Sequence, residues 1–204
     1  MFSKLYANQF AEITKNPNAT RSPYLIGPMH DAIAKFVENN SDFSTVAFPK
    51  SEYEFVTSQG TKKVDVAIFN KKNELVGAIM FKGIRSEYNK NANNYYEQMK
   101  GESSLFLEAN IPVFQIIFIP TQIKHKDYKG RASFETPTEK SFNNYENFIN
   151  CKSKYWEKLK LSVYYFDVDY TSFSASYSSK RISNIEETLE EGLINFIGGI
   201  SNNQ

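Results

Sequence analysis

An aspartate and a lysine interrupt the most apolar, strand-like stretch of the chain. Asp65 lies near the start of an expected strand at 63–70, and Lys82 ends a second expected strand at 75–82. A single acid or base within such apolar sequence is costly unless it faces a solvated cleft or an opposite charge. The sequence therefore predicts a functional site at this pair of strands.

The elements around the two strands predict an α/β fold with a mixed sheet. A helix beginning at Pro28 comes first, and a strand at 53–57 is expected to form an antiparallel meander with the two strands above. A helix at 91–109 leads to the apolar run 111–119, which reads as a strand buried on both faces. Because crossover connections are right-handed, this run is expected to lie parallel to the strand that ends at Lys82.

The remaining segments are expected to extend this core without an internal repeat or a domain boundary. Residues 121–140 are polar and basic, and residues 172–179 have the composition of an edge strand or a loop. An aromatic-rich strand is expected at 161–170. Further helices are expected at 1–15, 142–159 and 185–197, the last stopped by Gly198 and Gly199.

Charge and composition narrow the classes of function. The 204 residues carry 24 basic and 23 acidic side chains, so a nucleic-acid partner would have to be met by a local basic patch. One cysteine and two histidines argue against a His/Cys zinc cluster, so a metal would be bound by carboxylates, which favours Mg²⁺. His30 and His125 lack a recognisable nucleophile partner, which argues against a catalytic triad.

Other classes are disfavoured by what the sequence lacks. It has no glycine-rich phosphate loop, so we expect no nucleotide cofactor. It has no apolar run of signal-peptide or membrane-span length, so we expect a soluble, cytoplasmic protein without a membrane partner.

With Asp65 on the second strand and Lys82 on the third, the order of elements resembles the PD-(D/E)XK nuclease superfamily, to which many type II restriction endonucleases belong. The resemblance implies a restriction-endonuclease-like αβββαβ core over about 28–120. It also implies one nuclease-like domain, 1–204, in which 121–204 adds strands and a helix for DNA binding and dimerisation.

The same resemblance implies a function and its site residues. The expected activity is site-specific hydrolysis of phosphodiester bonds in double-stranded DNA with Mg²⁺, by a homodimer that matches a palindromic site. Asp65 and the backbone carbonyl of Phe81 would bind the metal, and Lys82 would orient or activate the attacking water.

Met80 occupies the position where this superfamily carries its second acid, and three explanations stay open. The acid has moved to the following helix, where Glu97 is the candidate catalytic and metal-binding residue, although Glu102 lies closer to the apolar stripe of that helix. Alternatively, Met80 is a natural or engineered replacement of a glutamate, and the chain is an inactive, nuclease-fold DNA-binding protein. In the third explanation the pattern is accidental. Glu38 and Glu54 are further candidate acids.

Two polar segments are candidates for contact with DNA. The segment after the lysine contributes Arg85, Lys90 and Asn91, whose side chains suit phosphate or base edges. The second segment interleaves a tyrosine with four basic residues: Lys124, Lys126, Lys129 and Arg131. Such charge runs are also typical of an ordinary solvated surface.

Overall fold

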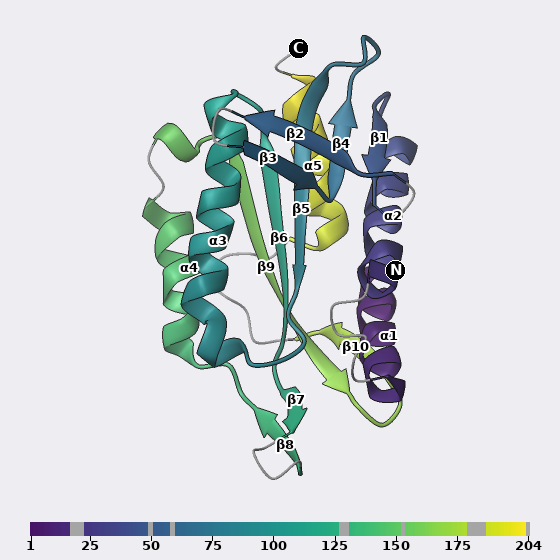
Figure 1. The fold of residues 1–204 in the computed structure, drawn as a ribbon, viewed down its shortest axis with the longest axis vertical. Coiled ribbons are helices and arrows are strands. Elements are labelled where there is room, and N and C mark those ends of the chain that lie inside the picture. Colours follow the sequence, from purple (N-terminus) through teal and green to yellow (C-terminus); the bar gives the residue numbers. More distant parts are fainter. Residues whose placement is uncertain are drawn as a thin grey trace.

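A mixed six-stranded sheet with flanking helices forms the centre of the protein (Figure 1). The computed structural model describes residues 1–16, 23–48, 51–57, 60–126, 131–151, 154–178 and 187–202. The sheet strands, in their spatial order, are β1 (Ser44–Ala47), β4 (Val66–Phe69), β5 (Leu75–Gly83), β6 (Val113–Pro120), β9 (Leu159–Asp169) and β10 (Ser174–Tyr177). Strands β1, β4 and β5 are antiparallel neighbours, β5, β6 and β9 are parallel, and β10 returns antiparallel to β9.

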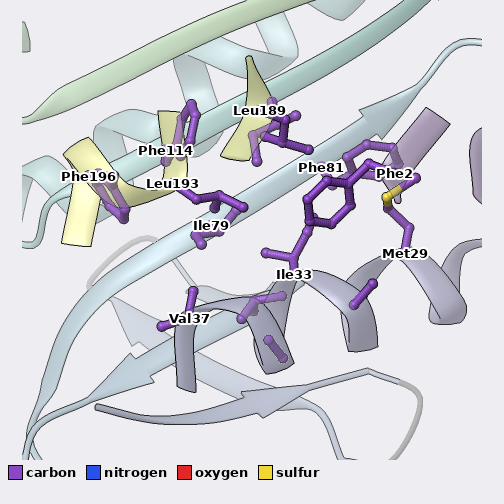
Figure 2. Packing of buried hydrophobic residues seen from close by; sticks show 14 of the residues in the cluster. Phe2, Met29, Ile33, Val37, Ile79, Phe81, Phe114, Leu189, Leu193 and Phe196 are labelled. Carbon is purple, nitrogen blue, oxygen red and sulfur yellow. The ribbon is translucent and has the colours of Figure 1, made fainter. Parts of the chain in front are cut away.

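Helices cover both faces of this sheet. The helices are α1 (Phe2–Lys15), α2 (Pro23–Asn39), α3 (Tyr88–Glu108), α4 (Glu139–Cys151) and α5 (Leu189–Ser201), with a short 3₁₀ turn at Lys154–Trp156. One apolar cluster joins α1, α2 and α5 to the sheet (Figure 2), and a second cluster joins α3 and α4 to it. None of the helices in the described ranges is long and apolar enough to cross a membrane.

Strand β6 lies between two apolar clusters, which explains why its residues are apolar at nearly every position instead of alternating with polar ones. Phe114 and Phe118 point into the cluster under α1 and α5, whereas Val113 and Ile117 point into the cluster under α3. Every residue of β6 is buried, and the strand lies parallel to β5, so both expectations for this run are confirmed. Its one buried polar residue is Gln115, which faces the α3 side.

The antiparallel meander is present and the strand at 53–57 is confirmed, but this strand is not the first strand of the meander. The 53–57 segment is β2 (Tyr53–Thr57), which pairs with β3 (Gly60–Val64) in a separate hairpin. Strand β1, not expected from the sequence, pairs with β4 instead. The reason is a bend at Asp65, which divides the expected 63–70 strand into β3 and β4.

Other boundaries also differ from the sequence prediction. The helix expected at 142–159 is α4, which ends at Cys151, and Leu159 already begins β9. Helix α2 begins at Pro23 and contains Pro28, and α5 continues past Gly198 to Ser201 because Ile200 packs into the core. The basic segment contains a second hairpin, β7 (Ile123–Lys126) with β8 (Ala132–Glu135), instead of only a loop. Strands β9 and β10 belong to the central sheet, so this sheet continues beyond residue 120.

Candidate functional site

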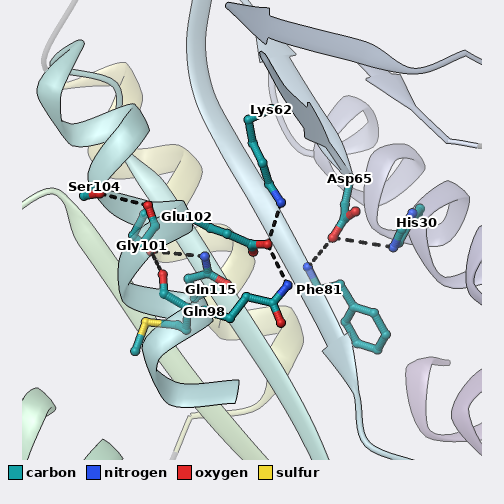
Figure 3. A network of polar contacts seen from close by, with 11 residues as sticks. His30, Lys62, Asp65, Phe81, Gln98, Gly101, Glu102, Ser104 and Gln115 are labelled. Atoms are coloured by element: carbon teal, nitrogen blue, oxygen red, sulfur yellow. Dashed lines mark hydrogen bonds and ion pairs between the residues drawn. The ribbon is translucent and has the colours of Figure 1, made fainter. Parts of the chain in front are cut away.

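Asp65 lies at the bend between β3 and β4 and binds the edge of β5 (Figure 3). Its Oδ2 atom accepts a hydrogen bond of 2.8 Å from the Phe81 amide. The β4–β5 pairing ends at Val66 and Ile79, so the Asp65 carboxylate replaces the partner strand beyond that point. Since the N–H and C=O of one strand residue point to the same edge, the Phe81 carbonyl also faces this opening.

Asp65 and Lys82 line the same cleft, which has a volume of about 210 Å³. Met80 and Lys82 lie two residues apart on β5 and therefore face the same side, toward α3. Lys82 is partly exposed, and its Nζ atom lies 4.8 Å from the centroid of the Tyr95 ring, in a cation–π contact. Both side chains therefore line one cleft, and the function of that cleft stays a prediction.

A second carboxylate enters this cleft from α3. The Oε1 atom of Glu102 accepts from Lys62 Nζ at 2.5 Å and from Gln98 Nε2 at 2.8 Å. The side chains of Glu102 and Lys62 are 19% and 24% exposed, so this ion pair is largely shielded from solvent. Deeper in the cleft, Gln115 donates to the hydroxyl of Ser103 at 3.1 Å. Figure 3 shows Glu102 and Asp65 on opposite sides of β5 near Phe81.

Burial changes the protonation of the groups around Asp65. It raises the pKa of Asp65, an effect opposed by the hydrogen bond from the Phe81 amide. It lowers the pKa of Lys82, an effect opposed by the nearby Glu102 carboxylate. It also lowers the pKa of His30, so this imidazole is uncharged near neutral pH.

His30 was not expected at the site. Its Nε2 atom lies 3.8 Å from Asp65 Oδ2, which is too long for a hydrogen bond. Both ring nitrogens are buried and, among the described residues, neither has a hydrogen-bond partner. His30 is therefore a buried, uncharged imidazole directly beside the Asp65 carboxylate.

The chemistry of the donor set fits a divalent metal ion. The carboxylates of Asp65 and Glu102 and the carbonyl of Phe81 are hard oxygen donors of the kind that Mg²⁺ prefers. Within the described ranges no three His, Cys, Asp or Glu side chains gather closely enough to form a complete metal site. Mg²⁺ is commonly bound by one or two carboxylates together with water and substrate phosphate, and this donor set is sufficient for that mode.

The other acids proposed from the sequence lie outside the cleft. Glu97 is 67% exposed and pairs with Lys100 at 3.5 Å, so it points away from Asp65 and Lys82. Glu38 accepts hydrogen bonds from the amide and hydroxyl of Thr45, which joins α2 to β1. Glu54 is exposed on β2. The structure therefore brings Asp65, Phe81 and Lys82 together but none of these three acids.

The residues after β5 that were proposed to bind DNA differ in their surroundings. Arg85 is partly buried, and its Nη1 atom has no hydrogen-bond partner among the described residues. Lys90 is 73% exposed and lies 3.5 Å from Glu87, and Asn91 donates to the Glu87 carbonyl. Arg85 is therefore the best placed of the three to receive an anion.

The basic hairpin is described only in part. Lys124 on β7 and Arg131 beside β8 are exposed. Lys126 ends β7, but its side chain, like the whole of Lys129, lies outside the described residues. The base of the hairpin is attached to the start of α3, because Asn89 Nδ2 donates to the Thr136 carbonyl at 2.9 Å.

The sequence contained weak signals for two residues of the cleft that were not among the predicted site residues. Glu102 borders the apolar stripe of α3, and Gln115 is the single polar residue in an apolar strand. Lys62 and His30 had no such signal, because their roles depend on how a hairpin and a distant helix pack on β5. Comparisons with protein-family models, with curated proteins and with solved structures gave no match.

Proposed function

We propose that this protein is a site-specific DNA endonuclease of the restriction type, which hydrolyses phosphodiester bonds in double-stranded DNA with Mg²⁺. The observation that carries the proposal is the cleft at the edge of β5, where Asp65, Lys82 and Glu102 lie together. Two carboxylates and a lysine with a lowered pKa suit metal-assisted hydrolysis of a phosphate ester.

Each side chain has a role in this proposal. Asp65 and the Phe81 carbonyl bind the cation at the open edge of β5, and Glu102 provides the second carboxylate in place of Met80. Bound Mg²⁺ supplies Lewis-acid stabilisation of the phosphate charge. Lys82 orients or activates the attacking water and offsets the charge that develops on the phosphate.

The order of the elements supports the proposal. With the β2–β3 hairpin inserted between β1 and β4, helix α2, the antiparallel strands β1, β4 and β5, helix α3 and the parallel strand β6 come in an αβββαβ order. We propose that this core has the restriction-endonuclease-like fold. Asp65 lies at the bend immediately before β4, the second of these strands, and Lys82 lies on β5, the third, which suits the metal ligand and the lysine of that fold.

Recognition of DNA is assigned to the polar segments that flank the cleft. Arg85 and Lys90 follow β5 directly, and Lys124 and Arg131 extend this basic surface along the β7–β8 hairpin. Basic side chains on accessible segments bind phosphates and set the position of the protein on the duplex. Cleavage of both strands of a palindrome requires two-fold symmetry, so we propose a homodimer.

Plasmid cleavage with Mg²⁺ tests the proposal. We expect the wild type to cut and Asp65→Ala and Lys82→Ala to lose about 100-fold or more in rate. Glu102→Ala should lose a similar factor, and Glu97→Ala, which removes an exposed acid of the same helix, is the matched control that should retain full activity. A wild type that neither binds nor cuts DNA would refute the proposal.

The position of Met80 favours a second candidate function. Met80 is buried on β5 beside Lys82, where its thioether provides no oxygen for Mg²⁺. The chain would then be a nuclease-fold protein that binds DNA without cutting it. If only Met80→Glu cuts plasmid DNA while the wild type shifts the same DNA in a gel, this candidate replaces the first.

A further inference from the structure

One of two consecutive lysines on β3 is directed into the cleft. Lys62 Nζ contacts Glu102 at 2.5 Å, whereas Lys63 is 61% exposed and pairs with Glu52 outside the cleft, also at 2.5 Å. The two side chains point to opposite faces because strand residues alternate. Lys62 is therefore an ammonium group that the fold places on the second carboxylate of the candidate site.

Aromatic contacts fix the hairpin that carries Lys62. Phe55 of β2 stacks on Phe106 of α3 with ring centroids 5.0 Å apart, and Tyr53 contacts the Phe69 ring edge-on at 5.1 Å. The chain then runs from Lys62 through two residues to Asp65, so both groups are positioned by one continuous segment. These contacts hold the hairpin that carries Lys62 against both α3, which carries Glu102, and β4.

The charges in the cleft are balanced without any added cation. Two carboxylates, Asp65 and Glu102, face two ammonium groups, Lys62 and Lys82. The same Glu102 oxygen accepts from both Lys62 and Gln98. A divalent cation on that oxygen would take the place of these donors and would be repelled by an ammonium group within a shielded cleft.

We propose that Lys62 competes with the divalent metal ion for Glu102, so that the β2–β3 hairpin weakens metal binding through this one carboxylate. The proposal rests on the proposed function, because it assumes that Glu102 belongs to the metal site. It assigns to Lys62 a positioning role: its ion pair with Glu102 determines whether that carboxylate is available.

Direct binding of Mn²⁺ to the full chain, measured by electron paramagnetic resonance in the absence of DNA, tests this competition. Lys62→Met should tighten binding by about tenfold, within the range usual for coupled sites. Lys62→Gln, which keeps a polar side chain on the hairpin, should act in the same direction. Lys63→Met, which breaks the equivalent pair outside the cleft, is the matched control and should leave binding unchanged.

A double-mutant cycle separates competition from simple repulsion. In a Glu102→Gln background the Lys62→Met substitution should have no further effect, whereas repulsion through space would persist. The proposal is overturned if Lys62→Met leaves the wild-type affinity unchanged or tightens binding equally in both backgrounds. If neither the wild type nor Lys62→Met binds Mn²⁺, the metal site itself is refuted together with the proposed function. If Mn²⁺ binding is lost in Asp65→Asn but unchanged in Lys62→Met, only the competition between Lys62 and the metal ion is refuted.

Discussion

Replacing Asp65 with asparagine should stabilise the protein while removing a ligand of the proposed metal site. The Asp65 side chain is 28% exposed, and its one hydrogen bond within the described part of the chain is that from the Phe81 amide at 2.8 Å. The nearest basic group, His30, lies 3.8 Å away and is uncharged because burial lowers its pKa. The charged form of Asp65 is therefore disfavoured in the folded protein, in agreement with its raised pKa.

The size of the effect follows from these contacts. An asparagine carbonyl keeps the hydrogen bond from Phe81 but without charge assistance, a loss of about 1 kcal/mol. The substitution also removes the desolvated charge, and the raised pKa of Asp65 indicates that this second effect is larger. We expect the free energy of unfolding to increase by about 1 kcal/mol at about pH 7, a size usual for single stabilising substitutions. For a chain of this size the melting temperature should rise by about 2–4 °C.

The raised pKa of Asp65 also determines how the stability difference between Asp65→Asn and the wild type changes with pH. Asp65 binds its proton more tightly in the folded protein than in the unfolded chain, where its pKa is near 3.8. Its destabilising effect is therefore complete above the folded-state pKa and disappears as the pH falls through that value toward 3.8. The advantage of Asp65→Asn over the wild type should shrink over the same interval.

Thermal melts followed by circular dichroism at a series of pH values measure this advantage. Asp42→Asn is the control, because Asp42 is exposed, contacts Lys71 at 2.8 Å and has a lowered pKa, so its replacement should not raise the melting temperature. If Asp65→Asn melts below the wild type at about pH 7, or if its advantage grows on acidification, then the carboxylate is stabilised in the fold and the reasoning is wrong.

Three further predictions concern the supporting structure. Gly192→Ala should cost about 1–3 kcal/mol because its Cβ would lie 2.9 Å from a tyrosine hydroxyl, whereas Gly198→Ala, with open space around it, should gain up to about 1 kcal/mol; urea unfolding of both variants compares them. Burial lowers the pKa of His30 below 6.5, so the unfolded chain takes up a proton first as the pH falls. The wild type should therefore lose stability between about pH 7.5 and about pH 5.5, and His30→Gln should lose less. Equal losses in the two proteins would contradict the lowered pKa of His30. Thr188→Ala removes the capping box formed with Glu191 and should lower the free energy of unfolding by about 1 kcal/mol, an effect that an unchanged urea midpoint would exclude.

Local patterns in the sequence were sufficient for much of the architecture. The unbroken apolar run at 111–119 predicted a strand buried on both faces, and β6 is such a strand because side chains alternate between two apolar clusters. The placement of Asp65 and Lys82 within apolar strands predicted a shared site, because charges in such sequence require a cleft or a partner. Both inferences depend on neighbours in the chain or on strand geometry alone.

The first strand of the meander could not be predicted in this way. Four residues, Ser44–Ala47, form β1 because they pair with β4, and so short a segment has too little pattern of its own to reveal this. The stronger alternation of Tyr53–Thr57 indicated a strand correctly, but not its partner. Pairing is decided by the bend at Asp65, which separates β3 from β4 and turns the hairpin over the cleft.

The sequence by itself placed Asp65 and Lys82 within two neighbouring apolar strands, with Met80 two residues before the lysine. Only the tertiary structure decided which other groups join them. Helical spacing alone left Glu97 as a candidate, yet the packing of α3 on the sheet turns Glu97 outward and brings Glu102 into the cleft. Lys62 arrives there through a hairpin whose position depends on aromatic contacts with α3 and β4. Such contacts join residues far apart in the chain, and their distances depend on side-chain packing that no local pattern encodes.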